Sequence, residues 1–153
     1  MKVIFLDIDG VMNAWETQPT KEKGGMLSIH APQLKQLQRI IEETGAKIVL
    51  SSTWRLYPDL KKKVLDSGIH FIDCTPCMRR PVGTSIEYCE RGKEIQDWLD
   101  RHPDVEDFVI IDDDNDMTEA QQSHYFRTTS ASKGLRKDIA NDIISYLNKH
   151  GIS

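Results

Sequence analysis

Near its N-terminus the chain reads KVIFLDIDGV, at residues 2–11. Residues 2–8 form a short, mostly apolar run that is rich in Val, Ile and Phe, which is typical of a buried strand. The run stops at Asp7-Ile8-Asp9-Gly10, where one apolar residue separates two carboxylates. A buried strand that ends in acids predicts that the chemistry of the protein begins at this point.

The rest of the chain alternates between strand and helix patterns. Residues 11–31 have no clean period and include Pro19 and a Gly pair, so we expect a long loop or flap there. The later patterns predict, in order, a helix over 32–44, a strand over 46–50, a helix marked by Leu56, Leu60 and Val64, a strand over 69–72, an irregular segment over 73–90, a helix from near Arg91, a strand over 107–111, a weak strand over 125–128 and a last helix marked by Ile139, Ile143 and Leu147.

Strands that alternate with helices predict the fold class α/β, a Rossmann-like doubly wound sandwich of three layers with a mostly parallel central sheet. The length of 153 residues favours a single domain over residues 1–153. We expect no large cap, because neither 11–31 nor 73–90 has room for an independent domain.

The composition excludes several classes of protein. With 39% hydrophobic and 29% charged residues the chain is typical of an ordered globular protein. It has no apolar stretch near the ~20 residues of a membrane span and no signal peptide, so we expect a cytoplasmic protein. The net charge of -4 provides no broad basic field for nucleic acid, although a local basic groove is compatible with it. No obligate protein partner is evident.

Three predicted strands end in polar pairs, which are Asp7/Asp9, Ser51/Ser52 and Asp112/Asp113. In open parallel sheets ligands bind outside the carboxyl ends of the strands, so we expect these pairs to meet. Carboxylates gathered at one edge repel each other unless a cation is bound, and oxygen ligands without nearby His or Cys favour Mg²⁺ over zinc. The sequence therefore predicts Mg²⁺ as the cofactor.

Two neighbouring carboxylates allow a division of labour between Asp7 and Asp9. One can attack phosphorus while Mg²⁺ screens its charge, and the other can protonate the leaving oxygen and later activate water. Gly10 allows the tight turn that brings backbone amides near a phosphate. A calcium loop is the alternative reading of Asp-x-Asp-Gly, but residues 10–13 supply none of its further ligands.

These residues resemble a known family, the haloacid dehalogenase (HAD) superfamily. Its four ordered motifs are similar to Phe5–Val11, the Ser51/Ser52 strand end, Arg91 or Lys93 at a helix start, and Ile110–Asp113. More narrowly, Ser52–Arg55, the segment from Arg91 to Leu99, and Gly134-Leu135 resemble a small, capless branch that occurs in nucleic-acid repair proteins and is distantly similar to polynucleotide kinase phosphatase domains.

The resemblance implies a HAD-type phosphoric monoester hydrolase that works through a phospho-aspartyl intermediate. It makes Asp7 the nucleophile and Asp9 the acid/base. The implied Mg²⁺ ligands are Asp7, the Asp9 carbonyl and Asp113, with Asp112 assisting. Ser51 or Ser52 would hold the phosphoryl group, and Arg91 or Lys93 would offset the charge of the transition state.

Several residues have two readings. Arg55 either contacts substrate phosphate or holds an active-site acid in place. Trp15 either stacks on a base or anchors a surface loop, whereas Trp54 and Trp98 are expected to pack. Asp114 and Asp116 either join the metal shell or serve the loop and a helix cap. A structural zinc site is one reading of His70, Cys74, Cys77 and Cys89. We favour the other reading, in which the cysteines are buried or free thiols. Arg79-Arg80 either touches an anionic substrate or is solvated.

Three hypotheses of function follow. The first is a phosphatase that acts on phosphorylated nucleic-acid ends or nucleotides, the second is a small-metabolite phosphatase with the same site, and the third is a non-catalytic phosphate-binding or partner-binding module. An open site without a large cap favours a large phosphorylated substrate. The complete set of Asp7, Asp9 and Asp113 argues against the third hypothesis.

Overall fold

The computed structural model describes residues 1–17, 27–87, 89–128 and 133–150. In these ranges strands and helices alternate along the chain. The elements are β1 (Lys2–Leu6), the 3₁₀ helix η1 (Trp15–Thr17), α1 (Ala31–Thr44), β2 (Lys47–Leu50), η3 (Thr53–Leu56), α2 (Pro58–Asp66), β3 (Phe71–Cys74), β4 (Arg80–Val82), β5 (Ser85–Glu87), α3 (Arg91–Asp100), β6 (Asp107–Asp112), η4 (Glu119–His124), β7 (Tyr125–Arg127) and α4 (Lys137–His150).

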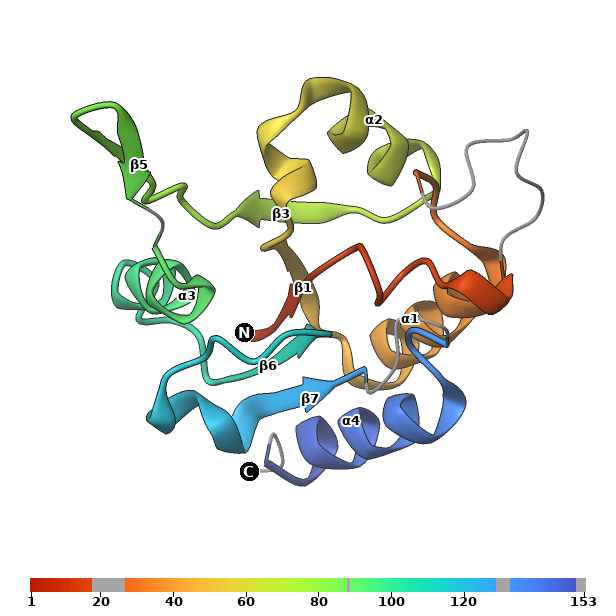
Figure 1. The fold of residues 1–153 in the computed structure, drawn as a ribbon. Helices are drawn as coiled ribbons and strands as arrows, with labels where there is room; N and C mark the ends of the chain where they lie inside the picture. The colour runs from red at the N-terminus through yellow and green to blue at the C-terminus, as the bar shows by residue number, and fades with distance from the viewer. Residues whose placement is uncertain (18–26, 88, 129–132, 151–153) are drawn as a thin grey trace.

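The strands build a parallel sheet with β1 at its centre (Figure 1). The order is β3-β2-β1-β6-β7, and every pairing in it is parallel. Leu6 at the end of β1 is in register with Leu50 on β2 and with Ile111 on β6. The residues that follow these three positions therefore lie next to one another at the carboxyl edge of the sheet.

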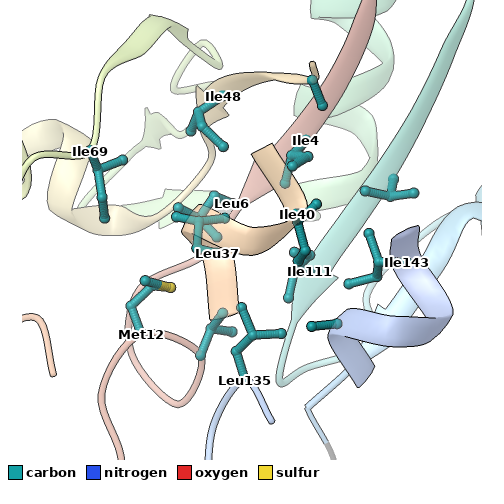
Figure 2. Packing of buried hydrophobic residues seen from close by; sticks show 14 of the residues in the cluster. Ile4, Leu6, Met12, Leu37, Ile40, Ile48, Ile69, Ile111, Leu135 and Ile143 are labelled. Atoms are coloured by element: carbon teal, nitrogen blue, oxygen red, sulfur yellow. The ribbon is translucent and has the colours of Figure 1, made fainter. Parts of the chain in front are cut away.

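Helices cover both faces of the sheet. Ile4 and Leu6 point to the face covered by α1 and α4, where they pack in one buried cluster with side chains such as Leu37 and Ile143 (Figure 2). The alternate residues of β1 point to the other face and pack against α3 in a second cluster that contains Val3, Phe5, Ile95 and Trp98. Because side chains alternate along a strand, each residue after the strand end also has a defined face.

The α/β class and the three-layer arrangement predicted from the sequence are confirmed. The prediction of an irregular segment over 73–90 is wrong in part, because β4 and β5 form an antiparallel hairpin that projects from the body beside α3 (Figure 1). Both strands have three residues and are too short for a periodic signal, and β4 also contains Pro81. No cap domain occurs in the described ranges.

Two other predictions are only partly within the described part of the chain. In the predicted loop or flap, residues 11–14 are buried in the core, and residues 18–26 lie outside the described ranges. Within those ranges, no helix has the length and apolar character needed to cross a membrane.

Gly92 on α3 approaches the loop after β6 so closely that a side chain has no room. A Cβ at this position would lie 2.8 Å from Thr118 N and 2.9 Å from Met117 Cα. We expect Gly92→Ala to lower the free energy of unfolding by about 1–3 kcal/mol, because overpacking outweighs the better helix propensity of Ala. Urea denaturation measures this, with the exposed Lys93→Ala as control. A Gly92→Ala protein as stable as wild type would show that the loop after β6 moves to make room for the added methyl group.

Candidate active site

Three side chains from adjacent strands meet at the carboxyl edge of the sheet. Asp7 and Ser51 are the first residues after β1 and β2, and Asp112 is the last residue of β6. Backbone hydrogen bonds continue beyond the ends of β1 and β2, from Asp7 N to Ile111 O and from Ser51 N to Leu6 O, both at 3.0 Å. By the alternation along each strand, all three side chains belong to the face covered by α3. The register of the sheet alone brings them together, as the sequence predicts.

Asp7, Asp112 and Asp113 form a compact acidic group. Each offers a carboxylate oxygen, and these oxygens lie within 4.8 Å of one another. Asp7 and Asp112 are buried and Asp113 is half-buried. Gly10 has a φ of 78°, and a Cβ on it would collide with the Asp113 carboxylate, so the turn after β1 tolerates only glycine this close to the group.

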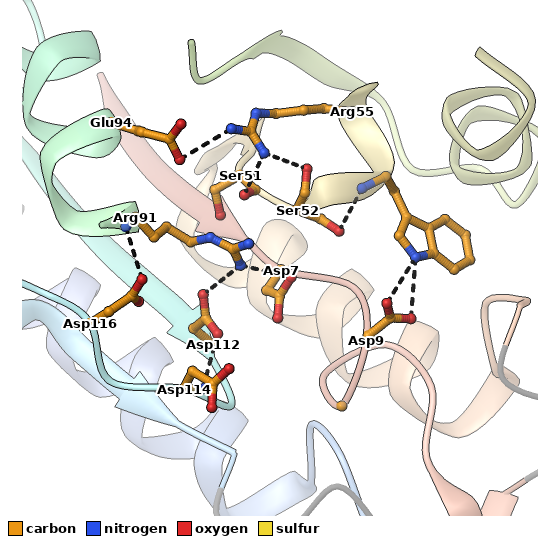
Figure 3. Close-up of polar contacts among 12 residues, drawn as sticks. Asp7, Asp9, Ser51, Ser52, Arg55, Arg91, Glu94, Asp112, Asp114 and Asp116 are labelled. Atoms are coloured by element: carbon orange, nitrogen blue, oxygen red, sulfur yellow. Dashed lines mark hydrogen bonds and ion pairs between the residues drawn. The ribbon is translucent and has the colours of Figure 1, made fainter. Parts of the chain in front are cut away.

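Arg91 neutralises part of this charge from the first turn of α3. Its Nη1 lies 3.0 Å from Asp7 Oδ1 and 2.9 Å from Asp112 Oδ2 (Figure 3). The Arg91 backbone N donates to Asp116 Oδ2 at 2.9 Å, an interaction that favours the start of a helix. Lys93 is exposed on the same helix. Of the two candidate bases, Arg91 is therefore the one that touches the acidic group.

The electrostatics of the group are unfavourable to its negative charges. Burial raises the pKa of Asp7 well above its usual range, Asp112 adds to the shift, and Arg91 opposes it. Burial also raises the pKa of Asp112, to about 6, again against the effect of Arg91. Burial lowers the pKa of Arg91, but Asp7 and Asp112 more than compensate, so it stays above its usual value. One guanidinium does not balance these acids.

The same geometry fits a hard divalent cation. Oxygens that share one Mg²⁺ at about 2.1 Å lie at most about 4.2 Å apart, so small side-chain shifts bring the oxygens of Asp7, Asp112 and Asp113 within range. The donors are all carboxylate oxygens, which is the set that Mg²⁺ takes in preference to zinc. Asp114 and Asp116 are exposed and are not in this group. The Asp114 backbone N instead donates to Asp112 Oδ1 at 3.0 Å.

Asp9 does not join the acidic group, in contrast to the expectation that both carboxylates face one cavity. Trp54 Nε1 lies 3.2 Å from each of its carboxylate oxygens, and Asn13 Nδ2 donates to Oδ1 at 3.1 Å. Figure 3 shows Asp9 on the opposite side of Asp7 from Arg91. The strand ends at Leu6, so the alternation that would align Asp7 with Asp9 stops before it reaches Asp9.

The two serines of the second strand end have different partners. The Ser52 hydroxyl accepts from Trp54 N at 3.1 Å and caps η3. The Ser51 hydroxyl is buried and has no hydrogen-bond partner among the described residues. A buried polar atom without a partner costs stability and indicates a functional site or a missing ligand. Ser51 is also the serine that is aligned with Asp7.

Arg55 is committed to the protein itself. Its guanidinium makes hydrogen bonds to the carbonyls of Ser51, Ser52, Thr75 and Pro76 and to Glu94 Oε1. Both side chains of the Arg55–Glu94 ion pair are more than nine-tenths buried. Of its two readings, this favours a supporting role, in which Arg55 fixes the loop that carries both serines, over direct contact with substrate.

The remaining candidates are Trp15 and the three cysteines. Trp15 is 63% exposed in η1, so stacking on a base stays a prediction. Among the described residues, Cys74, Cys77 and Cys89 form no disulfide and no metal-ligand group with His70. The choice between free thiols and a zinc site stays a prediction.

A cavity of about 270 Å³ opens beside the acidic group, and Arg91 forms part of its wall. Its lining includes three arginines, two acids and a threonine. The lining residues are Thr53, Arg55, Leu56, Arg79, Cys89, Arg91, Glu94 and Asp116. Whatever fills this cavity lies next to the group that Arg91 contacts.

Sequence reasoning missed three residues that hold the site together. Asn13 is fully buried, and its amide oxygen accepts from Gly10 N at 3.0 Å while its amide nitrogen reaches Asp9. Glu94 pairs with Arg55 and accepts from Met78 N at 2.9 Å. Trp54 packs as predicted but also holds Asp9. The sequence did offer one signal for such a residue: Glu94 is a charged residue on the otherwise apolar side of α3.

The raised pKa of Asp7 leads to a prediction on stability. In the metal-free protein at pH 7, Asp7 either stays charged beside Asp112 or takes up a proton, and both cost free energy. Asp7→Asn removes this cost, so we expect a rise in Tm of about 2–4 °C, which corresponds to about 1 kcal/mol in a chain of this size. The difference from wild type should shrink as the pH falls, because protonation removes the same charge.

Thermal unfolding with a metal chelator present measures this, with the exposed Asp114→Asn as the control. A lower Tm for Asp7→Asn at pH 7 would show that the ion pair with Arg91 outweighs the repulsion and the burial of Asp7.

Comparison with known proteins agrees with this geometry. A search of curated proteins gave no match. The model of one protein family, described as the HAD domain in Swiss Army Knife RNA repair proteins, matches residues 3–140. The match covers the strand ends, the Arg91 helix start and the acidic loop, and thus almost the whole chain. The chain therefore belongs to this family of HAD domains.

Proposed function

We propose that the protein is a Mg²⁺-dependent phosphomonoester hydrolase in which Asp7 is transiently phosphorylated. The observation that carries the proposal is the convergence of Asp7, Ser51, Asp112 and Arg91 at one sheet edge, with Arg91 Nη1 3.0 Å from Asp7 Oδ1. A carboxylate, a hydroxyl, a guanidinium and a metal-ligand group are the parts that phosphoryl transfer to an aspartate needs. Membership in the HAD family supports the same chemistry.

The first step transfers the phosphoryl group to Asp7. An Asp7 carboxylate oxygen attacks phosphorus, the bond from phosphorus to the leaving oxygen breaks, and Asp9 as a carboxylic acid gives its proton to that oxygen. The products are the alcohol and an aspartyl phosphate. Asp9 therefore ends this step as a carboxylate, ready to act as a base.

The second step releases phosphate. A water molecule attacks phosphorus, Asp9 takes its proton, and the bond from phosphorus to Asp7 breaks. Asp7 leaves as a carboxylate and Asp9 is again protonated, so both residues return to their starting states. One residue thus serves as acid and then as base.

The surrounding residues stabilise the charge that moves through these steps. Arg91 and the Ser51 hydroxyl would contact the phosphoryl oxygens, where negative charge accumulates. Asp7, Asp112 and Asp113 would hold Mg²⁺, which when bound screens the nucleophile from the phosphate and neutralises the developing charge. Burial raises the pKa of Asp7 and of Asp112, and the charge of Asp112 adds to the shift at Asp7, so a bound cation would favour their carboxylate forms.

The substrate class is proposed to be a phosphorylated nucleic-acid end. The family takes its description from RNA repair proteins. The cavity beside the acidic group is lined by Arg79 and Arg91, which suits a second phosphate near the one that is cleaved. With only a short hairpin between β3 and α3, nothing among the described residues closes over this site as a cap would.

Phosphate release by the purified protein tests the proposal. We expect turnover of an aryl phosphate, a mononucleotide and a 3′-phosphorylated oligonucleotide with Mg²⁺, loss of turnover with a chelator, and a fall of at least about 10³-fold in Asp7→Asn. Preference for a small phosphate ester over the oligonucleotide would favour the metabolite phosphatase. Undiminished activity in Asp7→Asn would refute Asp7 as the nucleophile, and binding without turnover would favour the non-catalytic module.

Arg79 distinguishes an oligonucleotide substrate from a small one. If Arg79 contacts a second phosphate, Arg79→Gln should raise KM for the oligonucleotide about 3–10-fold and weaken its dependence on salt, and leave KM for an aryl phosphate unchanged. Arg101→Gln at the other end of α3 is the matched control, since Arg101 is exposed and pairs with Asp97. An equal rise of KM for both substrates would contradict contact with a second phosphate.

A further inference from the structure

Two buried tryptophans of this protein each donate an indole N–H to a carboxylate. Trp54 and Trp98 are both 2% exposed. Trp98 Nε1 donates to Asp73 at 2.8 Å, on the face of the sheet that α3 covers. Trp54 Nε1 lies 3.2 Å from both oxygens of Asp9. The two tryptophans thus share their burial and their chemistry, but only Trp54 touches a residue of the proposed reaction.

Trp54 is itself held firmly. Its ring packs in the large buried cluster that also contains Leu37 and Val64. Its backbone N donates to Ser52 Oγ at 3.1 Å, and its carbonyl accepts from Tyr57 N at 3.2 Å. Arg55, the next residue, is fixed by five hydrogen bonds. The indole N–H is therefore a donor whose position is set by the core and not by solvent.

Asp9 is exposed, and it would otherwise sample several rotamers. Trp54 holds it from η3, and Asn13 holds its Oδ1 from the turn after β1 at 3.1 Å. Asn13 is fully buried and its own oxygen accepts from Gly10 N. Two donors from separate elements therefore restrict the carboxylate of an exposed side chain.

We propose that Trp54 is a positioning residue for Asp9, which it holds through the indole N–H in the orientation needed for proton transfer. This inference rests on the proposed function, because it assigns Asp9 as the group that protonates the leaving oxygen. A carboxyl group that is free to rotate is less often in reach of that oxygen, so the loss of the N–H slows the steps that need the proton.

The inference predicts an effect that depends on the leaving group. Nitrophenolate leaves readily without a proton, whereas the sugar hydroxyl of a 3′-phosphorylated oligonucleotide needs one. Since kcat/KM reports the steps up to departure of the leaving group, Trp54→Phe should lower kcat/KM for the oligonucleotide on the order of 10-fold more than for 4-nitrophenyl phosphate. A residue that only supports the fold would lower both alike.

The experiment measures kcat/KM for these two substrates with Mg²⁺ in wild type, Trp54→Phe and Trp98→Phe. Trp98→Phe is the matched control, because it also deletes a buried indole N–H that is bonded to a carboxylate. We expect the ratio of the two kcat/KM values to change in Trp54→Phe and to stay at the wild-type value in Trp98→Phe. Equal losses for both substrates in Trp54→Phe, or the same change of ratio in Trp98→Phe, would overturn the inference.

A double-mutant cycle separates positioning from packing. In an Asp9→Asn protein, Trp54→Phe should change the ratio no further, since the group that Trp54 positions is gone. An undiminished effect in that background would overturn the inference. If Trp54→Phe does not fold, a benzothienyl-alanine at position 54 keeps the ring system and removes the N–H, and the same ratio decides. Absence of Mg²⁺-dependent turnover in wild type would instead refute the proposed function.

Discussion

The in-register pairing of β1 with β2 on one side and β6 on the other is the constraint on which the site depends. Because Leu6 is aligned with Leu50 and Ile111, the next residues, Asp7, Ser51 and Asp112, are neighbours before any side-chain interaction is considered. A shift of one residue in either pairing would turn the affected side chain to the other face of the sheet. The large apolar side chains on both faces of β1 resist such a shift, so the core that stabilises the fold also assembles the site.

The charges and polar groups of the site lower the stability of the folded protein. Two buried carboxylates, a third one beside them and a single guanidinium leave excess negative charge in a medium that solvates it poorly. The buried Ser51 hydroxyl without a partner adds to the cost. Stability alone does not explain such an arrangement, which is typical of functional sites and agrees with our proposal that the site binds a cation and a phosphate. The Arg55–Glu94 pair fixes the loop that carries Ser51, and Asp116 binds the backbone at the start of the helix that carries Arg91.

Much of the fold and of the site follows from the sequence, because strong periodicity marks buried strands and amphipathic helices and because parallel strands expose their ends together. The strands at residues 2–6 and 107–112 and the helices at 31–44 and 91–100 match their predictions closely. The β4–β5 hairpin was not predicted, because strands of three residues are too short to show a period in the sequence. The orientation of Asp9 did not emerge either, since it depends on Trp54, a residue 45 positions away that the sequence marks only as apolar. The sequence did not decide between Arg91 and Lys93 or between Ser51 and Ser52. Each choice depends on which side of a helix or strand a residue faces, and this is seen only in the structure.

If Asp7 is the nucleophile, it carries the phosphoryl group during each turnover. The most direct measurement is an acid quench of the enzyme during turnover with Mg²⁺, followed by peptide mapping in a mass spectrometer. Asp9→Asn serves as a second sample, because loss of the base in the second step should let the intermediate accumulate. The predicted result is one phosphoryl group on the peptide that contains Asp7, absent in Asp7→Asn. Turnover without a phosphorylated Asp7 peptide, or with the phosphoryl group on another residue, would contradict the claim.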